Sequence, residues 1–332
     1  MEKPMLEIKD LRVLFPVHKK WLPAVDGVSL CIRPGEITGV VGESGSGKSV
    51  MSQSILRLRD HDTAVRYGGE ILFDKENILK KPLDEMREIR GNSISIIFQD
   101  PLNSLSPVHT VGKQLSETLI LHKKMTKQEA ETRAVEMLKL TGIPNPANCM
   151  KKYPFELSGG MQQRVMIAMA LSCEPKLLIA DEPTTALDVT IQEQILHLIR
   201  ELNEKLGMSV LFITHDMGAV SQLCHSVKVM YLGQVVEDAS TEELFARPLH
   251  PYTEGLLACI PHLGVERGKE LPTIEGSVPS LSKIPQGCHF CTRCRYADER
   301  CRTEQPPLVD VGDQHFVKCW KYASSENEKG EV

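Results

Sequence analysis

Short apolar runs alternate with amphipathic segments along the first 245 residues of the chain. A first strand is indicated by Leu6, Ile8 and Leu11. The runs typical of further strands lie at 25–32, 37–41, 94–98, 177–180 and 210–214. Apolar spacing predicts helices at about 48–58, 127–141, 161–172 and 190–206. Strands that alternate with helices predict an α/β fold around parallel strands, in which the more helical stretch 101–170 forms a subdomain.

The composition of the chain changes after about residue 245. Residues 247–253 are rich in turn formers, and the many prolines and glycines of 261–287 predict an extended connection. A cysteine cluster follows, and the polar end of the chain is expected to fray. We therefore expect a main domain at 5–245, a small cysteine-rich C-terminal region at 246–323 and a flexible tail at 324–332.

Charge and hydropathy exclude several classes of protein. The net charge is −5 and no block of lysine and arginine stands out, which argues against a nucleic-acid partner. No stretch approaches the ~20 apolar residues that cross a bilayer. The first five residues lack the apolar region of a signal peptide. Any role at a membrane is therefore expected to come through a partner protein.

The segment 42–49 fits the G-x-x-x-x-G-K-[ST] pattern between an expected strand and an expected helix. Glycines let the backbone curl so that its N–H groups face phosphates, and the helix N-terminus adds partial positive charge. Lys48 can reach the β- and γ-phosphates, and the Ser49 hydroxyl can bind Mg²⁺. The expected nucleotide contacts here are Gly42, Glu43, Ser44, Gly45, Ser46, Gly47, Lys48, Ser49 and Val50.

Two carboxylates, Asp181 and Glu182, end the apolar run at 177–180. Such a position lies at the carboxyl edge of a parallel sheet, where ligands bind in this architecture. Asp181 is expected to hold the Mg²⁺ shell, and Glu182 to accept the proton of an attacking water. By itself an exposed strand end explains the pair equally well. The phosphate loop favours the chemical interpretation.

Further motifs resemble those of the ATP-binding-cassette (ABC) ATPases. Residues 157–164, Leu-Ser-Gly-Gly-Met-Gln-Gln-Arg, resemble the signature sequence of that family. Gln99 resembles the Q-loop glutamine, 186–188 the D-loop and His215 the switch histidine. An aromatic residue is expected to stack on adenine, and the candidates are Phe15 and its rival Trp21.

The resemblance implies a P-loop ABC nucleotide-binding domain that hydrolyses ATP. It implies catalytic roles for Lys48, Gln99, Glu182 and His215, and Mg²⁺ contacts from Ser49, Gln99 and Asp181. In the family, ATP lies between the phosphate loop of one subunit and the signature of the other. The signature residues implied to bind ATP are Ser158, Gly159 and Gly160. Ser158 also reads as an ordinary helix cap, and capping and phosphate binding can coexist.

The region after 246 resembles one branch of the family more closely. The segments 250–253, 276–281 and 98–107 look like the oligopeptide/dipeptide (and nickel) importers. The resemblance implies a peripheral subunit on the cytoplasmic side of the inner membrane that drives uptake of di- or oligopeptides, with nickel or another small solute as the alternative. Implied partners are a second ABC ATPase, identical or related, two transmembrane permease subunits and an extracytoplasmic solute-binding protein.

Five of the ten cysteines crowd into the C-terminal region. Thiolates at this density suit zinc or an iron–sulfur cluster. In the branch resembled here, four cysteines can hold a [4Fe-4S] cluster. The positions that match are Cys288, Cys294, Cys301 and Cys319, and Cys291 is an extra thiol. Structural zinc and ordinary reduced thiols stay open as alternatives.

Two rival functions remain open at this stage. A soluble ABC ATPase that acts on nucleic acid or ribosomes would share the motifs. The single cassette, the acidic balance and the importer-like C-terminal region speak against it. A non-catalytic regulatory cassette is also conceivable, but every catalytic position of the motifs is intact.

Overall fold

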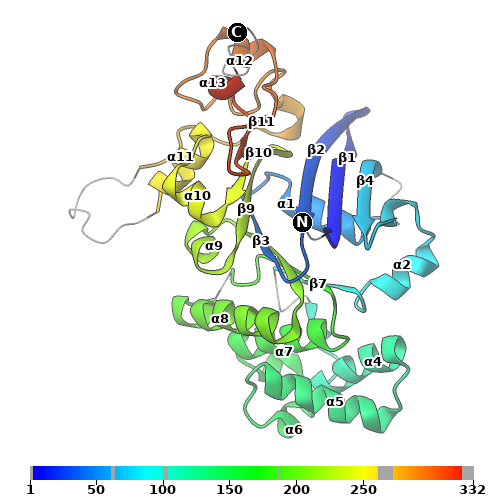
Figure 1. The fold of residues 1–332 in the computed structure, drawn as a ribbon. Coiled ribbons are helices and arrows are strands. Elements are labelled where there is room, and N and C mark those ends of the chain that lie inside the picture. Colours follow the sequence, from blue (N-terminus) through cyan, green and yellow to red (C-terminus); the bar gives the residue numbers. More distant parts are fainter. Residues whose placement is uncertain (1–2, 61–63, 100–103, 186, 261–271, 324–332) are drawn as a thin grey trace. The chain divides into compact units, whose positions relative to one another are not determined.

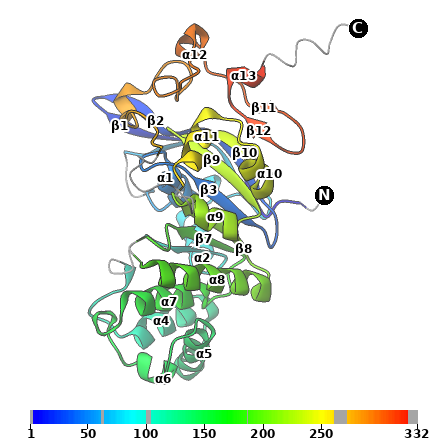
Figure 2. The ribbon, with the colours of Figure 1, turned by 90° about the vertical axis from the view of Figure 1, so that its left-hand side faces the viewer.

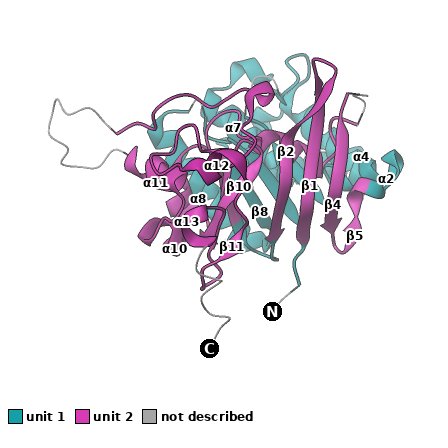
Figure 3. Cartoon of the chain, turned by 90° about the horizontal axis from the view of Figure 1, so that it is seen from above, with its two compact units in different colours: residues 1–5, 32–37, 80–213 teal, residues 6–31, 38–79, 214–332 magenta. Residues whose placement is uncertain are grey.

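The structure is a computed structural model that describes residues 3–60, 64–99, 104–185, 187–260 and 272–323. The chain divides into two units, coloured separately in Figure 3. Unit 1 consists of Met1–Met5, Ile32–Ile37 and Lys80–Ile213. Unit 2 consists of Leu6–Cys31, Thr38–Leu79 and Thr214–Val332. Neither unit is continuous in the sequence, because the chain passes between them repeatedly.

An antiparallel sheet in unit 2 has the strand order β2-β1-β4-β5 (Figure 1). Its strands are β1 (Leu6–Val17), β2 (Lys20–Ile32), β4 (Arg66–Phe73) and β5 (Glu76–Asn77). Ile8 and Leu11 are both buried although they are three residues apart, which strict alternation does not allow. The register against β4 shifts between Lys9 and Arg12, and this bulge returns Leu11 to the buried face.

A second group of strands in unit 2 runs through β3 and the C-terminal part of the chain. Strand β3 pairs in parallel with β9, and β9, β10, β12 and β11 then follow as antiparallel neighbours. The strands are β3 (Ile37–Val41), β9 (Ser226–Tyr231), β10 (Gln234–Ser240), β11 (Val309–Asp310) and β12 (Phe316–Val317). The strands after residue 246 thus extend the sheet that begins at β3, and the prediction of a small cysteine-rich C-terminal extension is not supported.

The helices of unit 2 are short. They are α1 (Lys48–Ile55), α9 (Met217–Leu223), α10 (Thr241–Ala246), α11 (Pro251–Ala258), α12 (Glu299–Thr303) and α13 (Trp320–Ala323), with 3-10 turns η1 (Ile78–Lys80) and η3 (Leu281–Lys283). The prediction of a turn-rich segment at 247–253 is partly wrong, because α11 begins at Pro251. Proline fits the first position of a helix, and the His250 side chain caps it by accepting from the Tyr252 N–H.

Unit 1 contains three parallel strands that are almost fully buried. Strand β7 pairs with β6 on one side and with β8 on the other. The strands are β6 (Ile94–Ile97), β7 (Leu177–Asp181) and β8 (Ser209–Thr214). Their continuous apolar runs fit a parallel sheet covered on both faces, which confirms the strands predicted from the sequence.

The helices of unit 1 include those predicted at 127–141, 161–172 and 190–206, together with others that the sequence analysis did not predict. They are α2 (Leu83–Ile89), α4 (Val111–Lys123), α5 (Lys127–Leu140), α6 (Pro146–Cys149), α7 (Gly159–Leu171) and α8 (Val189–Leu206), with the 3-10 turn η2 (Pro154–Glu156). In α8, Ile195, Leu198, Ile199 and Leu202 are buried at helical spacing, and Asp188 and Gly207 cap the two ends. Helices α4, α5 and α7 contact one another and α6 contacts α5 (Figure 2). The limits of a helical subdomain at 101–170 stay a prediction.

Three further predictions concern membrane crossing, the long connection and the end of the chain. Within the ranges that the structure describes, no helix is long and apolar enough to cross a membrane. Of the connection expected at 261–287, residues 261–271 lie outside the described residues. Residues 272–280 contain no helix or strand, as expected, and the turn η3 follows them. The tail predicted to fray at 324–332 also lies outside the described residues.

Candidate functional site

The predicted phosphate loop connects β3 to α1 in unit 2. Two of its glycines, Gly42 and Gly47, are required by close backbone contacts. A Cβ atom on Gly42 would lie 2.2 Å from the Met230 carbonyl oxygen, and one on Gly47 would lie 2.5 Å from that of Ala24. Gly47 also has φ 98°, in the left-handed region that favours glycine. Strands β2 and β9 therefore hold the loop from both sides within the unit.

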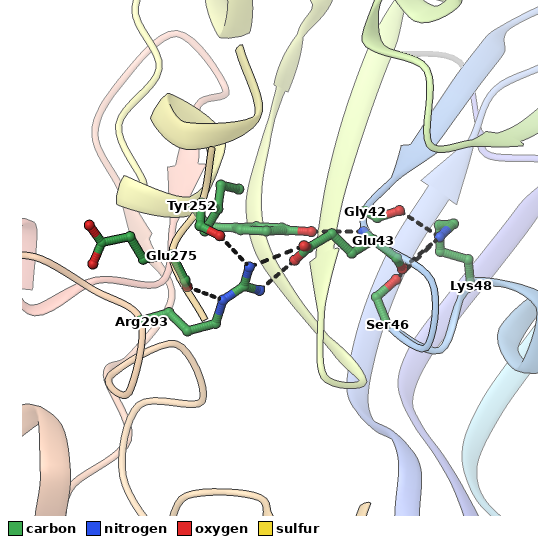
Figure 4. A network of polar contacts seen from close by, with 8 residues as sticks. Gly42, Glu43, Ser46, Lys48, Tyr252, Glu275 and Arg293 are labelled. Atoms are coloured by element: carbon green, nitrogen blue, oxygen red, sulfur yellow. Dashed lines mark hydrogen bonds and ion pairs between the residues drawn. The ribbon is translucent and has the colours of Figure 1, made fainter. Parts of the chain in front are cut away.

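The lysine of the loop is folded back onto the loop itself. Lys48 Nζ donates to the carbonyl oxygens of Gly42 at 2.6 Å and Glu43 at 3.0 Å, and it lies 3.4 Å from Ser46 Oγ (Figure 4). Lys48 is only 4% exposed. The ammonium group thus lies against the curled backbone, where a bound phosphate chain is expected.

The second residue of the loop is held by residues that the sequence analysis did not assign to the site. The Glu43 N–H donates to Tyr252 Oη at 2.8 Å. The Glu43 carboxylate pairs with the Arg293 guanidinium through contacts of 2.6 and 3.1 Å (Figure 4). The motif at 250–253 drew attention to Tyr252 only as a family resemblance, and no local signal indicated Arg293.

The other predicted contacts of the loop lie on its outer side or at the start of α1. Ser44 and Gly45 are exposed, whereas Ser49 and Val50 are half-buried in the first turn of the helix. An exposed His215 follows β8 and precedes α9, which Asp216 caps through the Gly218 and Ala219 N–H groups. His215 thus belongs to the same unit as the loop.

In each candidate for adenine stacking, an arginine guanidinium already lies over the aromatic ring. The Arg59 guanidinium lies 5.6 Å from the Phe15 ring centre, and that of Arg66 lies 4.0 Å from the Trp21 ring centre. Both aromatic rings are half-buried. The geometry does not choose between them, so the choice of Phe15 stays a prediction.

Unit 1 brings together two of the predicted catalytic residues. Gln99 follows β6 and Glu182 follows β7, and the two strands are parallel neighbours, so both residues lie at the same sheet edge. Gln99 Nε2 donates to Glu182 Oε2 at 2.9 Å, and Thr185 Oγ1 donates to the same oxygen at 3.1 Å. Asp181 ends β7 and is 3% exposed.

The signature segment 157–164 is linked through Gln163 to Pro183, the residue that follows the acidic pair. Ser158 caps α7 by accepting a hydrogen bond from the Met161 N–H, as predicted for an ordinary helix cap. Gln163 Nε2 donates to the Pro183 carbonyl oxygen at 2.6 Å, next to Glu182. Sequence reasoning named the signature but missed this link between the signature helix and the end of β7.

Crowding around the signature glycines is uneven. A Cβ atom on Gly159 would meet nothing within 4 Å, whereas one on Gly160 would lie 3.0 Å from Ile191. Of the predicted D-loop, Ala186 lies outside the described residues, and Asp188 caps α8 by accepting from the Ile191 N–H at 3.0 Å. The roles of all these residues in binding and hydrolysis stay predictions.

The five C-terminal cysteines carry free thiols, and burial raises the pKa of each of them, that of Cys288 to about 12. Cys288 and Cys301 are joined by a backbone hydrogen bond of 2.8 Å. Among the residues that the structure describes, no group of three or more histidine, cysteine, aspartate or glutamate side chains is arranged to hold a metal ion. The predicted cluster, and zinc as its alternative, are therefore not supported by this geometry.

Comparison with known proteins identifies two families along the chain. Residues 25–185 match the ABC transporter family, and residues 236–301 match the family described as "Oligopeptide/dipeptide transporter, C-terminal region". The chain is 49% identical to the "Probable peptide ABC transporter ATP-binding protein y4tR" of Sinorhizobium fredii, with 96% of this chain and 95% of that protein covered. It is also 49% identical to the "Oligopeptide transport ATP-binding protein AppD" of Bacillus subtilis, with 98% and 99% covered.

Solved structures support the same assignment. The ATP-binding cassette MJ0796, in a dimeric post-hydrolysis state bound to ADP and Pi, superposes with a TM-score of 0.64 at 31% identity, covering 71% of this chain and 99% of that one. This likeness confirms the predicted α/β fold of the ABC ATPases. The chain therefore belongs to the ATP-binding proteins of the ABC transporters, in the branch that carries the oligopeptide/dipeptide transporter C-terminal region.

Proposed function

We propose that this chain is the ATP-hydrolysing subunit of an importer for di- or oligopeptides. The observation that carries the proposal is the match over almost the whole length of both chains to peptide-transport ATP-binding proteins at 49% identity. The chain keeps the phosphate loop, the acidic pair and the signature together with the oligopeptide/dipeptide C-terminal region.

Hydrolysis proceeds by in-line attack of water on the γ-phosphate of ATP. Glu182 accepts the proton of this water, and its hydrogen bonds from Gln99 and Thr185 hold the carboxylate in place. Lys48 exchanges its contacts with the loop carbonyls for the β- and γ-phosphates, where its charge stabilises the transition state. His215 orients the water and contacts the γ-phosphate.

The residues that the family resemblance assigns to Mg²⁺ carry suitable oxygen donors. Asp181 offers a buried carboxylate, and Ser49 and Gln99 offer a hydroxyl and an amide oxygen, which are the ligands that Mg²⁺ prefers. When bound, Mg²⁺ neutralises charge on the β- and γ-phosphate oxygens. Gln99 donates to Glu182 through Nε2, which would leave its amide oxygen for Mg²⁺.

The proposed partners are those that the family resemblance implies. We propose that two ATP-binding subunits, identical or related, form a dimer in which the signature residues Ser158, Gly159 and Gly160 of one subunit bind the ATP held by the loop of the other. The dimer drives two permease subunits from the cytoplasmic side of the inner membrane, and a solute-binding protein delivers the peptide. Because ATP favours the closed dimer, its binding and hydrolysis can power the permease.

Uptake by cells tests the substrate class. Cells that lack this chain are expected to lose uptake of a labelled tripeptide and to regain it with the wild-type chain but not with Glu182→Gln. Uptake of a free amino acid serves as the control and is expected to stay unchanged. Unchanged peptide uptake together with lost nickel uptake would replace the peptide by nickel as the cargo.

Purification from membranes tests the assembly and the rival soluble function. The tagged chain is expected to copurify with permease subunits and with a second ATP-binding subunit or a second copy of itself. ATPase activity stimulated by RNA or DNA, with no copurifying permease, would favour a soluble ABC ATPase. A complex with no measurable turnover would indicate a regulatory cassette.

We further propose a [4Fe-4S] cluster on Cys288, Cys294, Cys301 and Cys319. The proposal rests on the spacing of these four cysteines, which matches the importer branch, and their thiols are free. Anaerobically purified protein is expected to be brown and to lose its colour in Cys294→Ser but not in Cys259→Ser. A colourless protein with one bound zinc, or with no metal, would contradict the cluster.

A further inference from the structure

One arginine from the cysteine-rich region reaches the phosphate loop within unit 2. Arg293 lies between Cys291 and Cys294 in the sequence. Its Nη1 lies 2.6 Å from Oε2 of Glu43, and its Nη2 lies 3.1 Å from Oε1 (Figure 4). This two-pronged geometry is the strong form of a carboxylate–guanidinium contact. It connects residues that are 250 positions apart in the chain.

Two further donors of the guanidinium are also occupied. Arg293 Nε donates to the Glu275 carbonyl oxygen at 2.9 Å, and Nη2 donates to that of Ile274 at 3.2 Å. The guanidinium carbon lies 5.9 Å from the Tyr231 ring centre. The side chain is only 3% exposed, so its position is fixed by its surroundings and differs from a surface ion pair.

A second contact from the C-terminal region holds the same loop residue by its backbone. Tyr252 is fully buried in α11 and accepts the hydrogen bond of the Glu43 N–H at 2.8 Å. Its ring packs against Tyr231 and Phe290 with centre distances of 4.7 and 5.3 Å. The backbone N–H of Glu43 thus points to Tyr252, and the side-chain carboxylate of Glu43 points to Arg293.

The charge of Glu43 matters because of what the loop binds. The carboxylate side chain is 30% exposed and belongs to the segment that must accept the negative polyphosphate of ATP. Without a cation beside it, this carboxylate would repel the phosphates and would lose its fixed position. Arg293 prevents both effects. It neutralises the charge of the Glu43 carboxylate, and it holds the Glu43 side chain outside the turn.

We propose that Arg293 is a positioning residue for ATP binding, through which the C-terminal region sets the conformation and charge of the phosphate loop. The inference rests on the proposed ATPase function and adds a role for a residue outside the ABC motifs. Arg293 acts through Glu43 and does not itself touch the reacting atoms.

Steady-state ATPase kinetics of the assembled complex test this role. Arg293→Gln is expected to raise the KM for ATP about tenfold, which corresponds to ~1.4 kcal/mol, and to leave kcat within about threefold. Glu43→Gln removes the carboxylate, so the double variant with Arg293→Gln is expected to recover most of the affinity. Arg293→Lys keeps the charge but loses the two-pronged contact and is expected to lie between wild type and Arg293→Gln.

Arg295→Gln is the matched control. Arg295 lies two residues away and pairs with Glu254 at 3.0 Å, but its side chain is 71% exposed and it does not contact the loop. Its KM is expected to equal that of wild type. Melting temperatures of all variants, together with ATP binding in a Glu182→Gln background, separate loss of affinity from loss of folding.

Two results would overturn the inference. A wild-type KM for Arg293→Gln would show that the ion pair does not influence the loop. A double variant as impaired as Arg293→Gln alone would show that Arg293 only supports the fold. If the wild-type complex itself fails to hydrolyse ATP, the proposed function fails instead, so the two failures are distinguishable.

Discussion

Gln99 donates a hydrogen bond to Glu182 across the ends of two neighbouring parallel strands, with 2.9 Å between Nε2 and Oε2. The two residues are 83 positions apart. Glu182 has φ 50°, and its own N–H donates to the Ile213 carbonyl oxygen at 2.8 Å. Backbone and side chain are thus both fixed, as the proposed role of Glu182 in orienting and deprotonating a water requires.

Replacing Glu182 by Gln is expected to separate binding from turnover. The amide keeps the shape of the side chain but cannot accept a proton, so kcat should fall by about 10²–10⁴-fold while ATP affinity stays near that of wild type. Single-turnover hydrolysis and equilibrium binding of ATP measure the two quantities. Glu193→Gln, at an exposed position of α8, is the control and should change neither. Equal loss of binding and turnover in Glu182→Gln would contradict the assigned role.

Replacing Lys48 by Ala is expected to remove ATP binding and ATP hydrolysis together. The buried Lys48 ammonium lies against the carbonyl oxygens of the loop, so without it ATP affinity should fall by at least about 30-fold, or ~2 kcal/mol, with turnover lost as well. Equilibrium binding of a fluorescent ATP analogue measures the change. Lys139→Ala removes an exposed lysine at the end of α5 and should bind ATP like wild type. Tight binding by Lys48→Ala would rule out the phosphate contact.

Two glycines of the loop are expected to differ in their tolerance of alanine. Gly45 and Gly47 both have positive φ, so each substitution costs about 1–2 kcal/mol in backbone strain. Only at Gly47 does the new Cβ also collide with a carbonyl oxygen, that of Ala24 at 2.5 Å, whereas Gly45 faces open space. Gly47→Ala should therefore bind ATP at least about tenfold more weakly than Gly45→Ala in a titration of the two variants. Equal affinities would mean that the loop moves freely away from β2.

Acid is expected to loosen the helix that carries Tyr252. Burial lowers the pKa of His250 from 6.5 to about 4. The imidazole is fully buried and accepts from the Tyr252 N–H at 3.1 Å, which requires its neutral form. Between these two values the unfolded chain binds more protons than the folded one. The free energy of unfolding therefore falls as pH drops from about 6.5 to 4, by on the order of 3 kcal/mol.

Chemical denaturation at several pH values measures this loss. In His250→Asn the amide oxygen can still cap α11 but does not titrate, so the slope between pH 6.5 and 4 should flatten. His225→Asn replaces an exposed histidine and should keep the wild-type slope. An unchanged slope in His250→Asn would assign the acid sensitivity to other groups.

The sequence by itself determined the features that depend on local spacing. The phosphate loop needs consecutive residues between a strand and a helix, and the apolar stripe of α8 repeats within one helix, so both can be read along the chain. The buried runs of β6, β7 and β8 also sufficed to predict parallel strands. The order of the motifs then indicated the family, and the whole-length comparisons confirmed it.

Only the tertiary structure decided how distant parts of each unit meet. The partners of Glu43 are 209 and 250 residues away, and nothing in the local pattern around Tyr252 or Arg293 indicates a contact with the loop. The bulge in β1 depends on its pairing with β4, and the arrangement of the C-terminal cysteines depends on the strands and turns around them. The spacing of apolar residues indicates which side of a helix or strand is buried. The identity of the neighbour on that side is set by the path of the whole chain.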